Sequence, residues 1–290
     1  MQITFERIKT EIINKIIEIG YVASDYVYDS LKKAATIESH ELAIDVLSTL
    51  CKNLDIAKER NFPLCQDTGI VVFWVKIGHK FPLNLFKLDI NRVSNFIYFD
   101  DLCNSAVKEA FSSVNFRHSI VKDPIERVNT KDNTPAIVHY EFVDGENLEI
   151  RIILKGAGSE NMSAIKMLNP ADGITGIRTF VLDVVKNSGG NACPPLTVGI
   201  GIGGNFETCA LLAKKSLFRT HSEKNPDPFW AKEEEYLLKE INTTGIGALG
   251  LGGITTALNV FIETKPCHIA SLPVAVNLEC HAHRLGILVF

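Results

Sequence analysis

Three of the seven cysteines in this chain lie in segments that also carry polar residues, and two of these segments contain prolines. Cys65 lies in Pro-Leu-Cys-Gln-Asp-Thr-Gly, Cys193 in Asn-Ala-Cys-Pro-Pro-Leu, and Cys280 in Asn-Leu-Glu-Cys-His-Ala-His-Arg. A [4Fe-4S] cluster is normally held by four thiolates, so three thiolates would leave one iron open to another ligand. An open iron is a Lewis acid that can polarise a hydroxyl or a carboxylate. These residue types therefore suggest dehydration rather than electron transfer.

The spacing of these cysteines does not by itself identify a metal site. They are too far apart in sequence to form the Cys-x-x-Cys signatures of zinc sites and ferredoxins. Free cysteine is also among the most buried residue types. We expect four cysteines, each in or beside an apolar segment, to pack as small hydrophobic residues: Cys51, Cys103, Cys209 and Cys267. Three cysteines and a histidine could instead hold structural zinc in a protein without catalytic activity.

The composition is that of a globular protein that acts on a small molecule. The chain has 290 residues, of which 46% are hydrophobic and 22% charged, and its net charge is −4. Lysines and arginines are scattered, so the sequence shows no footprint for nucleic acid or an anionic membrane. No apolar run approaches the roughly 18 residues of a membrane span, and the first residues lack the apolar stretch of a signal peptide. An odd number of widely spaced cysteines argues against a disulfide framework. We therefore expect a cytoplasmic protein with reduced thiols.

Hydrophobic periodicity predicts one α/β domain over residues 1–290, with a mixed sheet, flanking helices and a helical N-terminal region. Residues 3–19 carry an apolar stripe at steps of three and four, typical of an amphipathic helix that Gly20 can end. Ser24 and Ser39 are candidate N-caps of two further helices. Additional helices are predicted near residues 102–112, 171–187, 206–218 and 230–241.

Apolar runs rich in β-branched residues predict the strands. Residues 69–77 are almost continuously apolar, which is typical of a buried strand. Residues 136–142 and 148–154 flank a turn at Asp144 and Gly145, a pattern that predicts a hairpin. Later strands are expected at residues 196–202 and 255–262.

Five segments of the chain together resemble one known family. They are Leu-Cys-Gln-Asp-Thr-Gly (64–69), Asn-Thr-Lys-Asp-Asn-Thr-Pro-Ala (129–136), Lys-Gly-Ala-Gly-Ser-Glu-Asn (155–161), Ala-Cys-Pro-Pro (192–195) and His-Ile-Ala-Ser-Leu-Pro-Val-Ala-Val-Asn-Leu-Glu-Cys (268–280). In this order they resemble the iron–sulfur hydro-lyases of the class I fumarase and L-tartrate dehydratase family. The chain ends at Phe290, where single-chain class I fumarases continue into a smaller domain. The resemblance therefore implies an α subunit whose active site is completed by a separate β subunit, usually in an α2β2 assembly.

The resemblance also assigns roles to individual residues. Cys65, Cys193 and Cys280 would hold the [4Fe-4S] cluster, and Gln66 and Asp67 would hydrogen-bond the hydroxyl or a carboxylate of a dicarboxylate substrate. Further substrate contacts are expected from the Arg117 guanidinium, which suits a carboxylate, and from the backbone N–H of Gly158. His268 matches a histidine that lines the family's pocket, and we expect catalytic roles for Asp67 and His268. Lys131 stands where glycine is common in the family, at a position expected to be a turn.

Local sequence alone leaves simpler interpretations open for several of these residues. Arg117 could form a surface ion pair, Asp67 could be an ordinary turn residue, and His268 could be a hydrogen-bonded core histidine. His281 and His283 flank the last cysteine, and we expect them to lie outside the set of metal ligands. Two arginines, Arg127 and Arg284, are possible carboxylate contacts without a matching family motif.

The expected reaction is the reversible hydration of fumarate to L-malate. L(+)-tartrate dehydratase and mesaconate hydratase are the alternatives within the family. Loss of water requires help for the leaving hydroxide and a base for the proton on the neighbouring carbon. Asp67 is a candidate for proton handling, and a base on the β subunit is the alternative. We therefore expect this chain to be inactive by itself.

A different class of enzyme is suggested by the glycine run at residues 199–204. It satisfies Gly-x-Gly-x-x-Gly, the dinucleotide-binding fingerprint, between a predicted strand and a predicted helix. An NAD(P)-dependent oxidoreductase is therefore an alternative. The sequence shows neither a clear βαβ unit around the run nor an acidic residue closing a second strand about 20 residues further on. Close packing explains the glycines more simply.

Overall fold

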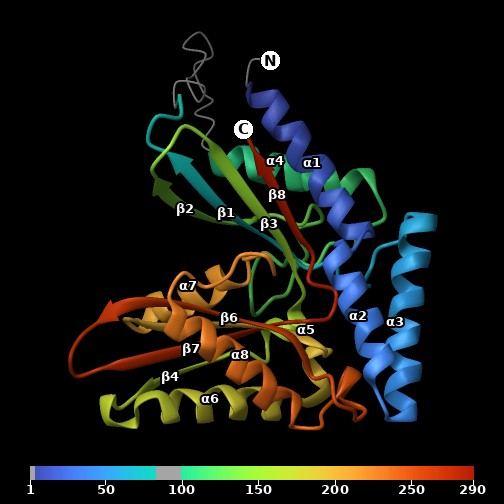
Figure 1. The fold of residues 1–290 in the computed structure, drawn as a ribbon. Coiled ribbons are helices and arrows are strands. Elements are labelled where there is room, and N and C mark those ends of the chain that lie inside the picture. Colours follow the sequence, from blue (N-terminus) through green and yellow to red (C-terminus); the bar gives the residue numbers. More distant parts are fainter. Residues whose placement is uncertain (1–3, 83–98) are drawn as a thin grey trace. The chain divides into compact units, whose positions relative to one another are not determined.

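The computed structural model describes residues 4–82 and 99–290, and the chain divides into two compact units (Figure 1). The first unit comprises Met1–Ser24, Ile56–Lys155 and Arg284–Phe290, and the second comprises Asp25–Asp55 and Gly156–His283. Residue 3, at the start of the predicted first helix, lies outside the described residues. Each unit contains one four-stranded mixed sheet, so the predicted α/β class is confirmed, with two sheets rather than one.

The sheet of the first unit contains β1 (Ile70–Gly78), β2 (Ile137–Val143), β3 (Leu148–Lys155) and β8 (Leu285–Val289). Their order is β2-β1-β3-β8, in which β1 is parallel to β2 and antiparallel to β3, and β3 is antiparallel to β8. The two inner strands β1 and β3 are buried along almost their whole length. The apolar run predicted for β1 is therefore explained by its central position.

Strands β2 and β3 do not form the predicted hairpin, because β1 lies between them. The short connection from β2 to β3 passes the end of β1 and is held there by backbone hydrogen bonds. The amide of Gly78 donates to the carbonyl of Asn147 at 2.9 Å, and the amide of Lys80 donates to the carbonyl of Gly145 at 3.0 Å. Local sequence shows a turn between two strands, but it does not show whether a third strand fills the space between them.

Helices α1 (Phe5–Tyr21) and α4 (Phe99–Ser113) pack on this sheet (Figure 1). The predicted stripe of α1 is confirmed, because Ile8, Ile12 and Ile16 are fully buried against α4 and the sheet. The helix continues one residue beyond Gly20 and ends at Tyr21. The first unit thus has its own hydrophobic core.

The sheet of the second unit contains β4 (Ala164–Leu168), β5 (Leu196–Gly204), β6 (Ala257–Cys267) and β7 (Leu272–Glu279). The order is β4-β7-β5-β6, in which β5 is parallel to β6, and β7 is antiparallel to both β4 and β5. Strands β4 and β7, like β8 of the first unit, were not anticipated from the sequence.

Several helices complete the second unit (Figure 1). They are α2 (Asp25–Ile37), α3 (Glu41–Arg60, whose residues from Ile56 belong to the first unit), α5 (Ala157–Glu160), α6 (Gly173–Ser188), α7 (Phe206–Ser216) and α8 (Pro228–Asn242). Helices α6 and α8 share a core with the branched side chains of β5, whereas α7 packs where β5 carries glycines. The predicted helices at 171–187, 206–218 and 230–241 are confirmed. The position before α2 is Ser24, as predicted, but α3 begins at Glu41, so Ser39 lies one residue too early to cap it.

The glycine run lies inside β5, where it allows α7 to approach closely. A Cβ atom at Gly201 would lie 2.0 Å from the carbonyl oxygen of Cys209, and one at Gly199 would lie 2.5 Å from the carbonyl oxygen of Ala213. Branched residues at the alternate positions, such as Ile200, point into the core with α6 and α8. The parallel pair of β5 and β6, joined by a crossover connection, was not predicted from the sequence. The space beside Gly199 and Gly201 is nevertheless filled by atoms of α7 and the residue that follows it. Close packing therefore explains the glycines without a bound dinucleotide.

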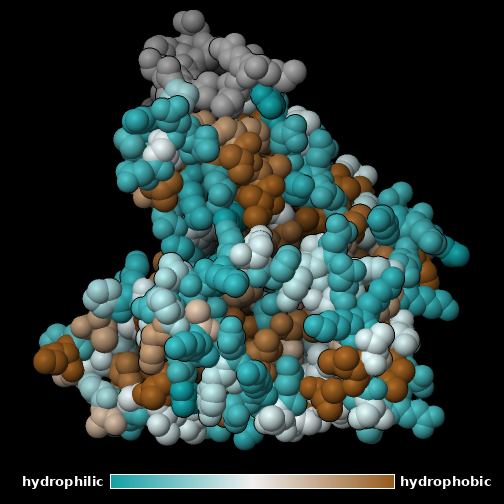
Figure 2. All heavy atoms as spheres, viewed as in Figure 1, coloured by the Kyte–Doolittle hydropathy of each residue, from teal (hydrophilic) through white to brown (hydrophobic). Residues whose placement is uncertain are grey.

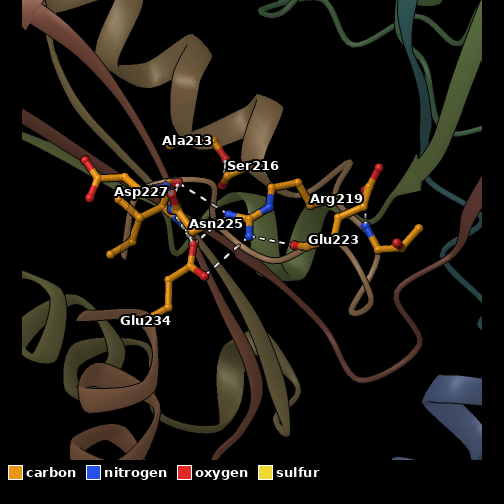
Figure 3. A network of polar contacts seen from close by, with 9 residues as sticks. Ala213, Ser216, Arg219, Glu223, Asn225, Asp227 and Glu234 are labelled. Carbon is orange, nitrogen blue, oxygen red and sulfur yellow. Dashed lines mark hydrogen bonds and ion pairs between the residues drawn. The ribbon is translucent and has the colours of Figure 1, made fainter. Parts of the chain in front are cut away.

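The outer edge of β6 is closed by a side-chain network (Figure 3). Glu234 accepts a hydrogen bond from the amide of Ile262 at 2.7 Å, and Asn225 donates to the Ile262 carbonyl at 2.9 Å. Arg219 pairs with Glu234 at 2.6 Å and donates to the carbonyl of Glu223 at 2.7 Å. Backbone groups that an edge strand would otherwise offer to another strand are thus satisfied at this position.

Polar side chains cover much of the face seen in Figure 2, with separate apolar areas between them. Among the described residues, Phe229 is 52% exposed and Ile269 is 92% exposed, both in the second unit. No helix in the described part of the chain is long and apolar enough to cross a membrane.

Replacing Gly201 with alanine should destabilise the second unit, because the new methyl group would overlap backbone atoms of α7. We expect the free energy of unfolding to fall by at least about 2 kcal/mol in chemical denaturation. Ile202→Val, which removes one methylene from the other face of β5, is the matched control and should cost about 1 kcal/mol. Equal effects of the two changes would contradict the packing explanation.

Candidate functional site

Cys65 lies in an irregular segment of the first unit, between α3 and β1. Its neighbour Leu64 is buried and donates its backbone N–H to the carbonyl of Gly20 at 2.9 Å. Two residues further on, Oδ1 of Asp67 accepts the N–H of Gly69 at 3.0 Å, which is the hydrogen bond of an Asx turn. The thiol of Cys65 is half-buried, and Gln66 is exposed. The Asp67 carboxylate is therefore oriented by the same turn that presents Cys65.

Two buried polar side chains fix this segment to the rest of the first unit. The Thr68 hydroxyl donates to the carbonyl of Arg117 at 2.6 Å. Asn133, which is fully buried, donates to the carbonyl of Gly69 at 3.1 Å and accepts the N–H of Ser119 at 2.7 Å. The expected site residues of the first unit are thereby held in one place: Cys65, Gln66, Asp67 and Arg117. Thr68 and Asn133 lie inside the family-like segments but had no predicted role.

Cys193 lies in the second unit, at the end of a short 3₁₀ helix (Gly189–Ala192). Its φ of 55° and ψ of 62° are in the left-handed region, and its side chain is exposed. The carbonyl of Cys193 accepts the backbone N–H of His281 at 3.2 Å, and Nδ1 of His281 lies 3.1 Å from the same oxygen. Because Cys280 precedes His281, the structure brings these two distant cysteine segments together. Non-glycine residues in this conformation are concentrated at functional sites.

Gly158 lies beside the same turn. A Cβ atom at this position would be 3.3 Å from the carbonyl oxygen of Asn191, two residues before Cys193. A side chain here would crowd the turn, whereas glycine leaves the backbone accessible. Gly158, Cys193 and Cys280 are therefore gathered in the second unit.

His268 is not gathered with these residues in the second unit. It lies in the loop between β6 and β7, so it precedes β7, whereas Cys280 follows the other end of that strand. A strand of eight residues separates the two loops by roughly 25 Å. The exposed imidazole accepts the N–H of Ala270 at 3.1 Å and lines a cavity of about 400 Å³ with Trp230. It is not a buried core histidine, and its catalytic role stays a prediction.

The remaining cysteines differ in environment from the expected ligands. Cys103 and Cys209 are fully buried, and burial raises the pKa of both thiols, which disfavours the thiolate that binds metal. Burial also raises the pKa of half-buried Cys51. The expectation of a packed, hydrophobic Cys267 is wrong, because this residue pairs with Gly204 at the last, solvent-exposed position of β6.

Two histidines near Cys280 have structural contacts in the second unit. The ring of His283 is buried and lies 2.9 Å from the carbonyl of Leu217 through Nε2, and the ring of His281 contacts the carbonyl of Cys193. Within either unit, the described His, Cys, Asp and Glu side chains form no group of three that could hold a metal ion. Lys131 has a φ of 66°, so the expected turn is present in a conformation that glycine adopts easily.

Comparison with known proteins identifies the class to which this fold and these segments belong. The family model described as fumarate hydratase (fumerase) matches residues 9–287, and the chain belongs to this family.

Its relatives include the "Putative L(+)-tartrate dehydratase subunit alpha" of Methanocaldococcus jannaschii, which is 43% identical over 272 residues, covering 92% of this chain and 91% of that protein. The L(+)-tartrate dehydratase subunit alpha of Escherichia coli K12 is 33% identical over 292 residues, covering 97% of this chain and 92% of that protein.

Asn133→Ala should loosen the Cys65 segment, because it leaves the Gly69 carbonyl and the Ser119 amide without their partner. We expect a loss of about 2–4 kcal/mol in the free energy of unfolding, measured by denaturant titration. Asn115→Ala, an exposed change in the same unit, should stay within about 0.5 kcal/mol of the wild type. A stability loss below about 1 kcal/mol in Asn133→Ala would argue against the anchoring role.

Proposed function

We propose that this chain is the α subunit of an iron–sulfur hydro-lyase that removes water from L(+)-tartrate. The observation that carries the proposal is the relationship to two proteins named as L(+)-tartrate dehydratase α subunits, each over more than nine-tenths of both chains. These names favour tartrate over fumarate, the substrate expected from the sequence. The word "subunit" in both names supports a separate β subunit as partner, and we propose an α2β2 assembly in the cytoplasm.

The proposed ligands of a [4Fe-4S] cluster are Cys65, Cys193 and Cys280. Their donor chemistry fits the group, because all three are thiols on irregular segments and none is fully buried, unlike Cys103 and Cys209. The segments of Cys193 and Cys280 are joined by the hydrogen bond from the backbone N–H of His281 to the Cys193 carbonyl. When bound, such a cluster supplies a Lewis-acidic iron for the hydroxyl and neighbouring carboxylate of the substrate.

The chain's own residues would bind and orient the substrate. The exposed Gln66 amide and Arg117 guanidinium suit the hydroxyl and one carboxylate, and the Gly158 segment offers backbone N–H at close range. The Asx turn holds the Asp67 carboxylate in a fixed orientation, which proton transfer requires. Asp67 is the candidate in this chain for handling the carbon-bound proton, and a base on the β subunit is the alternative. A catalytic role for His268, which lies in the loop between β6 and β7 of the second unit, stays a prediction.

Hydration of fumarate is the second candidate, and the family description supports it. Both reactions add or remove water next to a carboxylate, so they require the same cluster and the same carboxylate contacts. They differ at the carbon that loses the proton, which carries a hydroxyl group in tartrate but is a methylene in malate. The two functions are therefore distinguished by rates on different substrates rather than by the proposed ligands.

We predict that the chain alone is inactive and that anaerobic reconstitution of its cluster together with the β subunit restores dehydration. Initial rates on both tartrate enantiomers, L-malate and fumarate should be highest for L(+)-tartrate. A higher kcat/KM for malate and fumarate would replace tartrate with the second candidate. Full activity of the α chain without its partner would contradict the shared active site.

Serine substitution should identify the cluster ligands. Cys65→Ser, Cys193→Ser and Cys280→Ser should each lower iron and inorganic sulfide content after anaerobic reconstitution, because serine is a poor ligand for iron–sulfur clusters. Cys267→Ser, which changes an exposed thiol outside the proposed set, is the matched control and should retain wild-type content. The wild type should be brown and bleach in air, whereas a colourless, air-stable protein containing zinc would support the structural-zinc alternative.

A further inference from the structure

The described residues include three buried arginines, and two of them are paired with glutamate. Nε of Arg151 lies 2.6 Å from Glu149, and Nη1 of Arg219 lies 2.6 Å from Glu234. Figure 3 shows how the Arg219 guanidinium is surrounded by its acceptors. Arg284 is the least exposed of the three, at 2%, yet no carboxylate in the described part of the chain pairs with it.

Both the backbone and the guanidinium group of Arg284 form hydrogen bonds within the first unit. Its carbonyl accepts the N–H of Leu154 at 3.1 Å, just before β8 begins. Its Nη1 donates to the backbone carbonyl of Asp67 at 2.9 Å. The guanidinium therefore contacts the segment that carries Cys65 and Gln66, and the next residue in that segment, Thr68, donates to the Arg117 carbonyl.

The other edge of the Arg284 guanidinium has no partner. Nε and Nη2 are both buried and make no hydrogen bond with any described residue. These two nitrogens direct parallel N–H bonds from one side of the planar group, which is the geometry that accepts a carboxylate in bidentate fashion. Arginine stays protonated in proteins, so this edge combines a buried positive charge with two unsatisfied donors. Such a charge requires an anion to compensate it.

We infer that Arg284 binds one carboxylate of the substrate through Nε and Nη2, while Nη1 holds the Asp67 backbone. The inference rests on the proposed function, because the ligand class is the dicarboxylate substrate of the hydro-lyase. It adds to the exposed Arg117 a second, buried guanidinium, which contacts the segment that carries Asp67. Arg284 thus both binds the substrate and positions the residue proposed to handle the proton.

The binding role can be tested with succinate, which has two carboxylates but no hydroxyl to eliminate. We would titrate succinate calorimetrically into the anaerobically reconstituted complex of the chain with its β subunit, using wild type, Arg284→Lys and Arg284→Gln. Lysine keeps a positive charge and a donor but loses the two-pronged edge. Arg60→Lys, at an exposed arginine of the same unit, is the matched control.

We expect both Arg284 variants to bind succinate at least about tenfold more weakly than wild type and to show a matching rise in KM. Iron content and the visible spectrum should remain those of wild type, and Arg60→Lys should change none of these values. Succinate affinities within about twofold of wild type in both variants would overturn the inference. An arginine with a purely structural role would change the stability of the protein but not its affinity for succinate.

A crystal structure of the wild-type complex with succinate decides the matter if neither variant folds. A succinate carboxylate on Nε and Nη2 would support the inference, and protein atoms or ordered water on this edge would overturn it. Failure of the proposed function is separately visible. If the wild-type complex eliminates water from none of the substrates but binds succinate through Arg284, the proposed hydro-lyase activity is wrong and the proposed anion site is still supported.

Discussion

The arrangement of the first unit depends on hydrogen bonds that buried side chains make to an irregular backbone. Residues 64–69 belong to neither a helix nor a strand, so their buried peptide groups need partners from elsewhere in the chain. Asn133 provides such a partner to the Gly69 carbonyl, and the Thr68 hydroxyl joins the segment to the carbonyl of Arg117. Because polar groups left unpaired in the interior are costly, these bonds restrict the loop to one conformation and thereby fix Asp67.

In the second unit, close backbone packing helps to hold the elements in place. Glycines on β5 allow α7 to approach the sheet, while branched residues on its other face build a core with α6 and α8. The turn at Cys193 is joined to the Cys280 segment by a hydrogen bond to His281. A thiol on a short, constrained turn can be held ready for a ligand at little further cost in conformational entropy.

Sequence patterns predicted the parts of the structure that local periodicity determines. The α1 stripe is confirmed because Ile8, Ile12 and Ile16 must share one face of the helix to be buried. The hairpin of β2 and β3 was wrong because strand partners depend on distant segments, here β1. Strand β7 was missed because Pro273 and the polar Asn277 interrupt its apolar pattern.

The candidate site was predictable only in part, for the same reason. Motifs indicated Cys193 and Cys280, and the contact between their segments follows from tertiary structure alone. Asn133 had no predicted role, yet it is fully buried and holds two other segments. Arg284 matched no motif, and its proposed role rests on its burial and on donors without acceptors.

The closed margin of β6 constrains how this protein can associate with other chains. Where Glu234 and Asn225 occupy the amide and carbonyl of Ile262, an incoming polypeptide cannot extend the sheet without first displacing them. Oligomers built by continuing this sheet from one molecule into the next are thereby disfavoured at that margin. At this position, contact with another chain would have to use side-chain surfaces, where shape and charge distinguish one partner from another.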